Sequence, residues 1–456
     1  MRWKNTKITG LILFTALNLQ AQKLVLPKFI SNGMVIQRQT KAPVWGWTTP
    51  GTTVEVTGSW NNTKVASIAD ANGKFTVQLN TPAAGGPYTI KIIAGTSEKI
   101  VSEVLSGEVW ICSGQSNMAL KLSEADLWRV SGDNNPQIRF FEATAARSST
   151  AQDTLKSGIW RYGAMSGNMQ SVSAVGYYFA RRLQENLKIP IGMIGAYAGG
   201  TAIEEWTNPA VMAMYPDLLN AYPIPSAGRE AGNLYNATVY PLIPYKIAGF
   251  IWYQGENNVA RIQHYDKNLK ALVADWRKSF DNNQLPFYLA QLPTYNATWM
   301  EFRELQEGIT NTMKNAGMVV TLDVGDNSTI HPTNKKPVGD RMGDIALAKD
   351  YGYTSISYSS PLFRSVLAEG SKMRVFFNYA DKGLKLTSGV APLYFEIAGA
   401  NGTYYNADAR IEGNTVLVWA AEVTTPVSVK YFWKSYGVPN LFSTDGLPVA
   451  PFRSKK

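Results

Sequence analysis

The chain has 456 residues, of which 45% are hydrophobic and 17% charged, so it is a core-forming globular chain and not a disordered one. Its single cysteine, Cys112, excludes an intramolecular disulfide and a cysteine zinc cluster, and its two histidines, His264 and His331, argue against a multi-histidine metal site. The net charge of +10 comes from scattered basic residues, which favours a solvated mixed surface over a nucleic-acid-binding patch. The length predicts two to three domains.

The first 21 residues have the pattern of a secretory signal peptide. Three basic residues within positions 2–7 precede an apolar run, Ile8–Leu19, and a small residue, Ala21, stands at the expected cleavage site. The run is too short for a membrane span, which needs about 20 residues. Cleavage would remove three of the 44 basic residues and none of the 34 acidic ones, leaving +7. We therefore expect export across the inner membrane to the periplasm or cell surface, and no membrane span in the mature chain.

Residues 22–104 read as an N-terminal β domain. Short strand-like runs alternate there with turn signals such as Pro50-Gly51 and Asn72-Gly73, a spacing typical of a sandwich. Residues 356–456 return to the same kind of sequence and predict a C-terminal β domain. Its expected strands are Met373–Phe377, Leu393–Ile397 and Thr415–Trp419.

Residues 105–355 alternate between strands and helices, which predicts an α/β domain with a mainly parallel sheet covered on both faces. Ser173 is placed to cap the first amphipathic helix, which ends before Pro190. The expected strands are Glu108–Cys112, Ile189–Ala196, Ile247–Tyr253, Pro286–Leu292 and Met318–Val324, and the later helices are Tyr265–Phe280 and Phe302–Met313.

Polar, glycine-bearing loops follow four of these strands. In an open α/β sheet, ligands bind beyond the carboxyl ends of the strands, so we expect these loops to meet at one edge. Together they supply a serine, a histidine, carboxylates, amides and flexible backbone, which are the components of a serine hydrolase. The four loops are Ser113–Met118, Tyr197–Thr201, Gln254–Asn258 and Gly325–Pro332.

Ser116 is the candidate nucleophile and His331 the candidate base. A serine hydroxyl attacks only when a neighbouring base takes its proton, and His331 lies in a loop at the same predicted edge. Its only rival, His264, precedes an amphipathic helix and is expected to be a surface or capping residue. Alone, Ser116 could equally cap a helix, and Met118 breaks the Gly-x-Ser-x-Gly elbow of α/β hydrolases.

A carboxylate that orients the imidazole has three candidates: Asp326, which we favour, and Asp323 or Glu256 as alternatives. Each could instead cap or bind local backbone. Gly199 and Gly200 would allow backbone N–H groups to approach an oxyanion, although a simple tight turn explains them equally well.

These loops also carry a resemblance to a known family. They are similar to the motif blocks of the sialate O-acetylesterase family in the SGNH-hydrolase superfamily, and the likeness spans almost the whole mature chain. The matching segments are Gly107–Met118, Gly199–Thr201 with Glu205-Trp206, Ile251–Asn258, Asp323–Asp326 with Ile330–Pro332 and Lys335, and the flanking segments Met34–Arg38, Val44–Trp47 and Gly446–Arg453.

The resemblance implies a flavodoxin-like SGNH core flanked by β-sandwich-type regions, and it places the family's serine on Ser116 and its histidine on His331. It implies oxyanion donors from the Ser116 N–H, from Gly200 or alternatively Gly199, and from Gln254 or Asn257. The superfamily's usual Asp three residues before the histidine is replaced here by Ser328, so the acid comes from elsewhere or the site works as a Ser–His dyad.

The predicted function is that of a serine esterase that removes O-acetyl groups from sugars, with O-acetylated sialic acids the first expectation. Acetylxylan or another acetylated plant polysaccharide is the alternative substrate. From a different functional class, a non-catalytic surface carbohydrate-binding protein is the alternative. We expect an acetylated carbohydrate partner, no nucleic-acid partner, no metal and no organic cofactor; the sequence does not indicate an oligomeric state.

Overall fold

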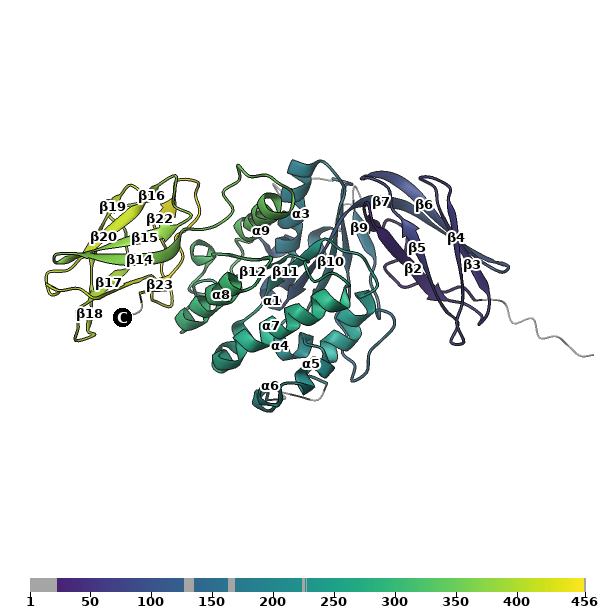
Figure 1. Ribbon diagram of the computed structural model, residues 1–456, viewed down its shortest axis with the longest axis horizontal. Helices are drawn as coiled ribbons and strands as arrows, with labels where there is room; N and C mark the ends of the chain where they lie inside the picture. Colours follow the sequence, from purple (N-terminus) through teal and green to yellow (C-terminus); the bar gives the residue numbers. More distant parts are fainter. Residues whose placement is uncertain (1–22, 127–134, 163–168, 224–225, 227, 455–456) are drawn as a thin grey trace, which may run out of the picture.

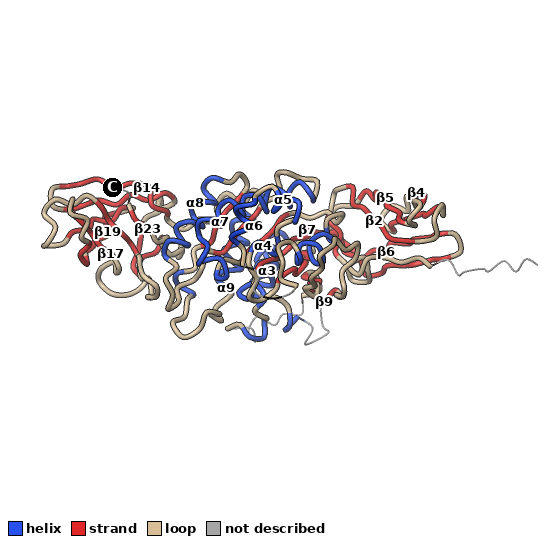
Figure 2. The backbone as a smooth tube through the Cα atoms, turned by 90° about the horizontal axis from the view of Figure 1, so that it is seen from below, coloured by secondary structure: helices blue, strands red, loops and turns tan. Residues whose placement is uncertain are grey.

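The computed structural model describes residues 23–126, 135–162, 169–223, 226 and 228–454. The expected signal peptide, residues 1–21, lies outside them. Three parts follow one another along the long axis of the molecule: an N-terminal β region, an α/β centre and a C-terminal β region (Figure 1). Helices are concentrated in the centre, and strands form both ends (Figure 2).

The central sheet has the order β13-β12-β11-β7-β10-β8-β9. Neighbouring strands are parallel except β9, which pairs antiparallel with β8 at the edge, so the expected mainly parallel sheet is confirmed. The strands are β7 (Ser97–Gly114), β8 (Ile138–Glu142), β9 (Trp160–Tyr162), β10 (Ile191–Tyr197), β11 (Gly249–Tyr253), β12 (Phe287–Ala290) and β13 (Ala316–Val319).

Five strands of the central sheet follow the flavodoxin-like order, which is 2-1-3-4-5. The run β10-β7-β11-β12-β13 has this order when its strands are numbered along the chain, with β7 first and β10 second. β8 and β9 extend the sheet beyond β10. β7 occupies the middle of the sheet, where its carboxyl end meets loops from both sides.

Two helical layers cover the sheet. On one face α3 (Ala174–Leu187) and α9 (Lys336–Asp350) pack over a core that includes Trp110, Phe179 and Met342. On the other, α7 (Ile262–Ser279) and α8 (Met300–Thr312) bury Trp252 and Trp276 among others. The short helices are α1 (Ser116–Ala119), α4 (Ile203–Trp206), α5 (Pro209–Ala213) and α6 (Pro216–Ala221).

The predicted helices are confirmed, with small shifts in their bounds. The Ser173 hydroxyl caps α3 by accepting from the Gly176 N–H at 3.0 Å, as expected. The strand expected over Met318–Val324 is wrong beyond Val319: β13 spans Ala316–Val319, and Leu322–Val324 form a 3-10 turn. The Thr321 hydroxyl there donates to the Gln291 carbonyl, just after β12, at 2.8 Å.

The N-terminal β region is joined to the centre through β7. The amino-terminal part of β7 pairs with β6 and β1, and its carboxyl-terminal part, from Glu108, pairs with β10. β7 therefore runs across the domain boundary expected at residue 104. The other strands are β1 (Val35–Gln37), β2 (Lys41–Trp47), β3 (Thr53–Gly58), β4 (Lys64–Ile68), β5 (Lys74–Asn80) and β6 (Gly85–Ala94), with β2 and β5 forming a separate antiparallel pair.

The C-terminal β region contains two four-stranded antiparallel sheets, β14-β15-β20-β19 and β18-β17-β21-β23, and the pair β16-β22. Side chains from both large sheets share one core, in which Val375 and Val416 meet Ile397 and Tyr431. The strands are β14 (Leu362–Glu369), β15 (Lys372–Asn378), β16 (Leu384–Leu386), β17 (Phe395–Ala398), β18 (Tyr404–Asn406), β19 (Asp408–Glu412), β20 (Thr415–Trp419), β21 (Ser428–Tyr431), β22 (Leu441–Ser443) and β23 (Phe452–Arg453).

Candidate active site

Ser116 lies where β7 ends in the middle of the sheet. Gly114 has φ +132°, and a Cβ there would lie 2.2 Å from the Tyr253 carbonyl oxygen, so only glycine lets the chain turn this close to β11. The Gln115 N–H donates to the same carbonyl at 3.0 Å. Ser116 then begins α1, half-buried, with its side chain at the carboxyl edge of the sheet.

His331 meets Ser116 directly. Its Nε2 lies 2.8 Å from the Ser116 Oγ, although the two residues are 215 positions apart in the chain. This distance suits proton transfer from a hydroxyl to a general base. Partial burial lowers the pKa of His331, and the positive charge of Lys335 lowers it further, while Glu124 acts in the opposite direction. The neutral imidazole, which accepts the proton, is thereby favoured.

None of the three predicted acids forms a hydrogen bond with His331 in the described part of the chain. Asp326 instead accepts from the Ser328 N–H at 2.7 Å and the Ser328 hydroxyl at 2.6 Å, bonds that lower its pKa. Asp323 forms a bidentate ion pair with Arg341 of α9, at 2.8 and 2.6 Å. Glu256 points to Asn117. The geometry thus brings together a Ser–His pair and leaves these carboxylates in structural roles.

Two of the predicted oxyanion donors have free backbone N–H groups. Within the described ranges, the N–H groups of Ser116 and Gly200 have no hydrogen-bond partner. Gly200 has φ +67°, and a Cβ built on Gly199 would lie 3.7 Å from the Cβ of Ser116, so this turn lies against the nucleophile. Backbone N–H groups at such a point can stabilise a developing oxyanion.

The two predicted amide donors differ in their surroundings. Gln254 is fully buried, and its Nε2 donates to the Thr201 carbonyl at 3.1 Å and to Asn258 Oδ1 at 2.8 Å. Asn257 is exposed, and its Nδ2 donates to the Gly200 carbonyl at 2.9 Å, which leaves a second N–H on the same nitrogen. The geometry favours Asn257 as the side-chain donor and Gln254 as a support for the loops.

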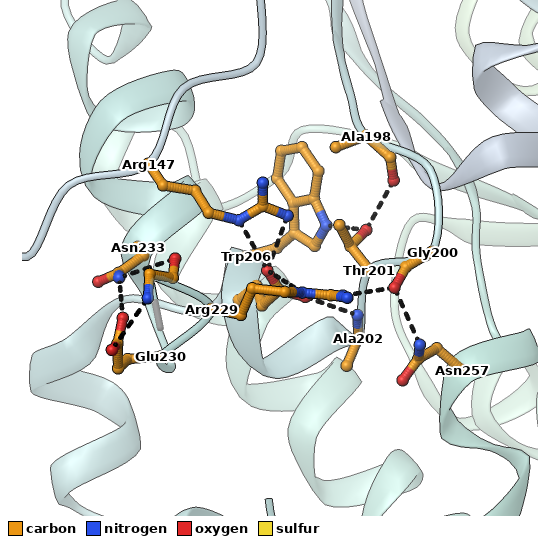
Figure 3. Close-up of polar contacts among 12 residues, drawn as sticks. Arg147, Ala198, Gly200, Thr201, Ala202, Trp206, Arg229, Glu230, Asn233 and Asn257 are labelled. Atoms are coloured by element: carbon orange, nitrogen blue, oxygen red, sulfur yellow. Dashed lines mark hydrogen bonds and ion pairs between the residues drawn. The ribbon is translucent and has the colours of Figure 1, made fainter. Parts of the chain in front are cut away.

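Two arginines bind one buried carboxylate near the Gly200 turn, and one of them, Arg229, also contacts Gly200 (Figure 3). The buried Glu205 carboxylate accepts from Arg147 at 3.0 Å and from Arg229 at 2.7 Å. Arg229 also donates to the Gly200 carbonyl, the oxygen that Asn257 contacts. The two guanidinium side chains remain 33% and 25% exposed, so each keeps surface that a ligand can reach.

Sequence reasoning did not assign a role to Asn117 and Lys335. The Asn117 amide donates to Glu256 at 2.5 Å and to the Ile330 carbonyl at 3.1 Å, and it accepts from the Lys335 ammonium at 2.5 Å. In the sequence, only their positions indicated a role at the site: Asn117 follows the nucleophile, and Lys335 lies four residues after the base. Neither position reveals that the two side chains meet in the interior.

A groove of about 560 Å³ adjoins the Gly199 turn, a size within the range that binds small ligands. Polar and charged side chains line it, including Lys121, Glu142, Arg161 and Tyr197. Among the described residues, no group of three or more His, Cys, Asp or Glu side chains is placed to hold a metal ion. The described helices include none that is long and apolar enough to cross a membrane.

A family model, curated relatives and one solved structure relate this chain to carbohydrate acetylesterases. Residues 106–348 match the family described as carbohydrate esterase, sialic acid-specific acetylesterase. Sialate O-acetylesterases of Pongo abelii and Homo sapiens are 29% and 28% identical over 379 residues, covering 73% of this chain and 72% of theirs. The crystal structure of a carbohydrate acetylesterase from Xanthomonas citri has a TM-score of 0.88 and 33% identity, covering 95% of this chain and 100% of that one. The chain therefore belongs to the sialic acid-specific acetylesterase family of carbohydrate esterases and is a carboxylic ester hydrolase.

Proposed function

We propose that this chain removes O-acetyl groups from sialic acids through an acyl-enzyme formed on Ser116. The observation that carries the proposal is the 2.8 Å contact between the Ser116 Oγ and the His331 Nε2. A non-catalytic carbohydrate binder has no need of such a pair, which the fold builds from loops 215 residues apart. The activity of the family supports the same reaction class.

The reaction takes two steps. The Ser116 Oγ attacks the acetyl carbonyl as its proton passes to the His331 Nε2, and the oxyanion accepts hydrogen bonds from the N–H groups of Ser116 and Gly200 and from the Asn257 amide. His331 returns the proton to the sugar oxygen as the carbon–oxygen ester bond breaks. Water then attacks the acetyl-serine with His331 again as the base, releasing acetate and restoring Ser116.

The charge around the site supports an acidic sugar over a neutral xylan chain. Sialic acids carry a carboxylate, and guanidinium groups bind carboxylates with strong, often bidentate, hydrogen bonds. Arg147 and Arg229 outnumber the one carboxylate they share and keep exposed surface beside the Gly200 turn. A xylan backbone carries no carboxylate that these guanidinium groups could bind.

Acetate release from O-acetylated N-acetylneuraminic acid, from its methyl ester and from acetylated xylan tests the proposal. We expect the free acid to have the highest kcat/KM and its preference over the methyl ester to fall about 10- to 100-fold in Arg147→Met, since a hydrogen bond to a charged group contributes about 1.5–3 kcal/mol. A wild-type enzyme that prefers acetylxylan would contradict the proposal and support the plant-polysaccharide alternative.

We also infer that the chain acts outside the cytoplasm, which rests on the signal-peptide pattern of residues 1–21. Expression of the full sequence in a bacterium, followed by fractionation and N-terminal sequencing, is expected to give a periplasmic or surface product that begins near Gln22. A cytoplasmic product that retains Met1 would refute the inference.

A further inference from the structure

The Asn117 amide joins the two loops that carry the dyad. Asn117 directly follows Ser116 in α1, and its Nδ2 donates at 3.1 Å to the carbonyl of Ile330, the residue before His331. One side chain therefore links the backbone of the nucleophile to the backbone of the base. The Ser116–His331 contact joins the same two loops directly through the catalytic side chains.

Two charged side chains fix the orientation of that amide. The Lys335 ammonium donates to Asn117 Oδ1, and the Glu256 carboxylate accepts from Asn117 Nδ2, both at 2.5 Å. An amide has a donor end and an acceptor end, so a cation at one end and an anion at the other allow a single orientation. Asn117 and Lys335 are 0% and 1% exposed, so water does not compete for these bonds.

The arrangement is costly if its role is only structural. Burial raises the pKa of Glu256 and lowers that of Lys335 to about 7, and one Glu256 carboxylate oxygen is buried without a hydrogen bond in the described part of the chain. A buried charged pair contributes little net stability compared with well-packed apolar side chains. A positional role at the edge of the active site accounts for its presence.

We propose that Asn117 is a positioning residue that holds Ser116 and His331 in register, and that Lys335 and Glu256 hold the Asn117 amide for this task. The proposal rests on the proposed function, because it assigns a role relative to the Ser116–His331 dyad. Among the described residues no carboxylate bonds to the His331 imidazole, and the proposal accounts for this because Asn117 fixes the backbone of the histidine loop instead.

The charge of Lys335 acts on the pKa of His331, which is a quantity that can be measured separately from the stability of the fold. The charged groups that act on His331 are Lys335, on its own loop, and Glu124, from the segment after α1. The Lys335 ammonium disfavours the imidazolium, so its removal raises the pKa of His331. The acid limb of the kcat/KM profile, where His331 gains a proton and activity is lost, then moves to higher pH.

Two variants and one control test the proposal with 4-nitrophenyl acetate. In Asn117→Ala we expect kcat to fall about 10- to 100-fold with KM little changed, because misplacing a catalytic group by about 1 Å has an effect of that size. In Lys335→Met we expect the acid limb to shift to higher pH. Lys336→Met is the matched control: the neighbouring side chain pairs with Asp340 within α9, and its profile should match wild type.

An Asn117→Ala enzyme that is folded by circular dichroism and keeps kcat within about twofold of wild type would overturn the proposal, as would an unmoved acid limb in Lys335→Met. If Lys335→Met does not fold, the double variant Lys335→Met with Glu256→Gln removes both charges, and the same upward shift is required of it. Ser116→Ala, measured in parallel, separates the two proposals. Full activity there refutes the nucleophile, whereas an inactive Ser116→Ala beside a normal Asn117→Ala refutes only the positioning role.

Discussion

Replacement of Gly114 by alanine should damage both stability and catalysis through one contact. The new Cβ would lie 2.2 Å from the Tyr253 oxygen and 2.7 Å from its carbonyl carbon, both backbone atoms of a central strand. Forcing a side chain into packed surroundings costs about 1–3 kcal/mol. The positive φ of +132° adds about 1–3 kcal/mol for a non-glycine residue. We therefore expect the free energy of unfolding to fall by about 2–6 kcal/mol.

The same carbonyl accepts the Gln115 N–H, so its displacement also moves the residue before Ser116. We expect kcat for 4-nitrophenyl acetate to fall about 10- to 100-fold, because the Ser116 Oγ then loses its alignment with His331. Gly51→Ala is the control for a positive φ without the clash, since Gly51 has φ +76° and open space around its Cβ. Urea unfolding and steady-state kinetics measure both effects. A Gly114→Ala enzyme with the stability of Gly51→Ala and wild-type kcat would refute the reasoning.

Three further predictions follow from the site. The acid limb of the kcat/KM profile should have its midpoint below pH 6.5, the ordinary pKa of histidine, because burial and Lys335 lower the pKa of His331 and the neutral base persists to lower pH; a midpoint above 6.5 would contradict this. Asn257→Ala should lower kcat about 10²- to 10³-fold, because an oxyanion donor is lost, whereas Gln254→Ala should chiefly lower the urea midpoint. Equal effects on kcat in two well-folded variants would contradict the assignment of Asn257 as the donor and Gln254 as the loop support. Cys112, fully buried and with its pKa raised by burial, should react with a thiol reagent only after unfolding, and fast labelling of the native enzyme would disprove its placement.

The order of strands and helices in the centre could be predicted from the sequence, because the spacing of apolar residues reflects which side chains are buried. Ser173 and the apolar stripe behind it predicted α3, and strong β-type runs predicted β15 and β20. β7 was predicted only from Glu108 to Cys112. Its earlier half contains several exposed polar residues and pairs with the N-terminal sheet. A local sequence pattern does not show that one strand belongs to two sheets.

The Ser116–His331 dyad could be predicted for two reasons. The chain has only two histidines, of which His331 was the credible base, and both Ser116 and His331 follow the carboxyl ends of predicted strands. The polar surroundings of the dyad could not be predicted, because they depend on which side chains meet across the sheet edge. Asp326 lies five residues from His331, yet it binds Ser328, and Lys335 turns inward to Asn117. Sequence distance does not determine which way a loop carboxylate or a buried ammonium points.

The role of Ser116 is tested by the rate of 4-nitrophenyl acetate hydrolysis by folded Ser116→Ala enzyme. We expect a loss of at least about a thousandfold in kcat/KM, because the nucleophile that forms the acyl-enzyme is gone. A folded variant within about tenfold of the wild-type kcat/KM would contradict the central claim that Ser116 carries the acetyl group.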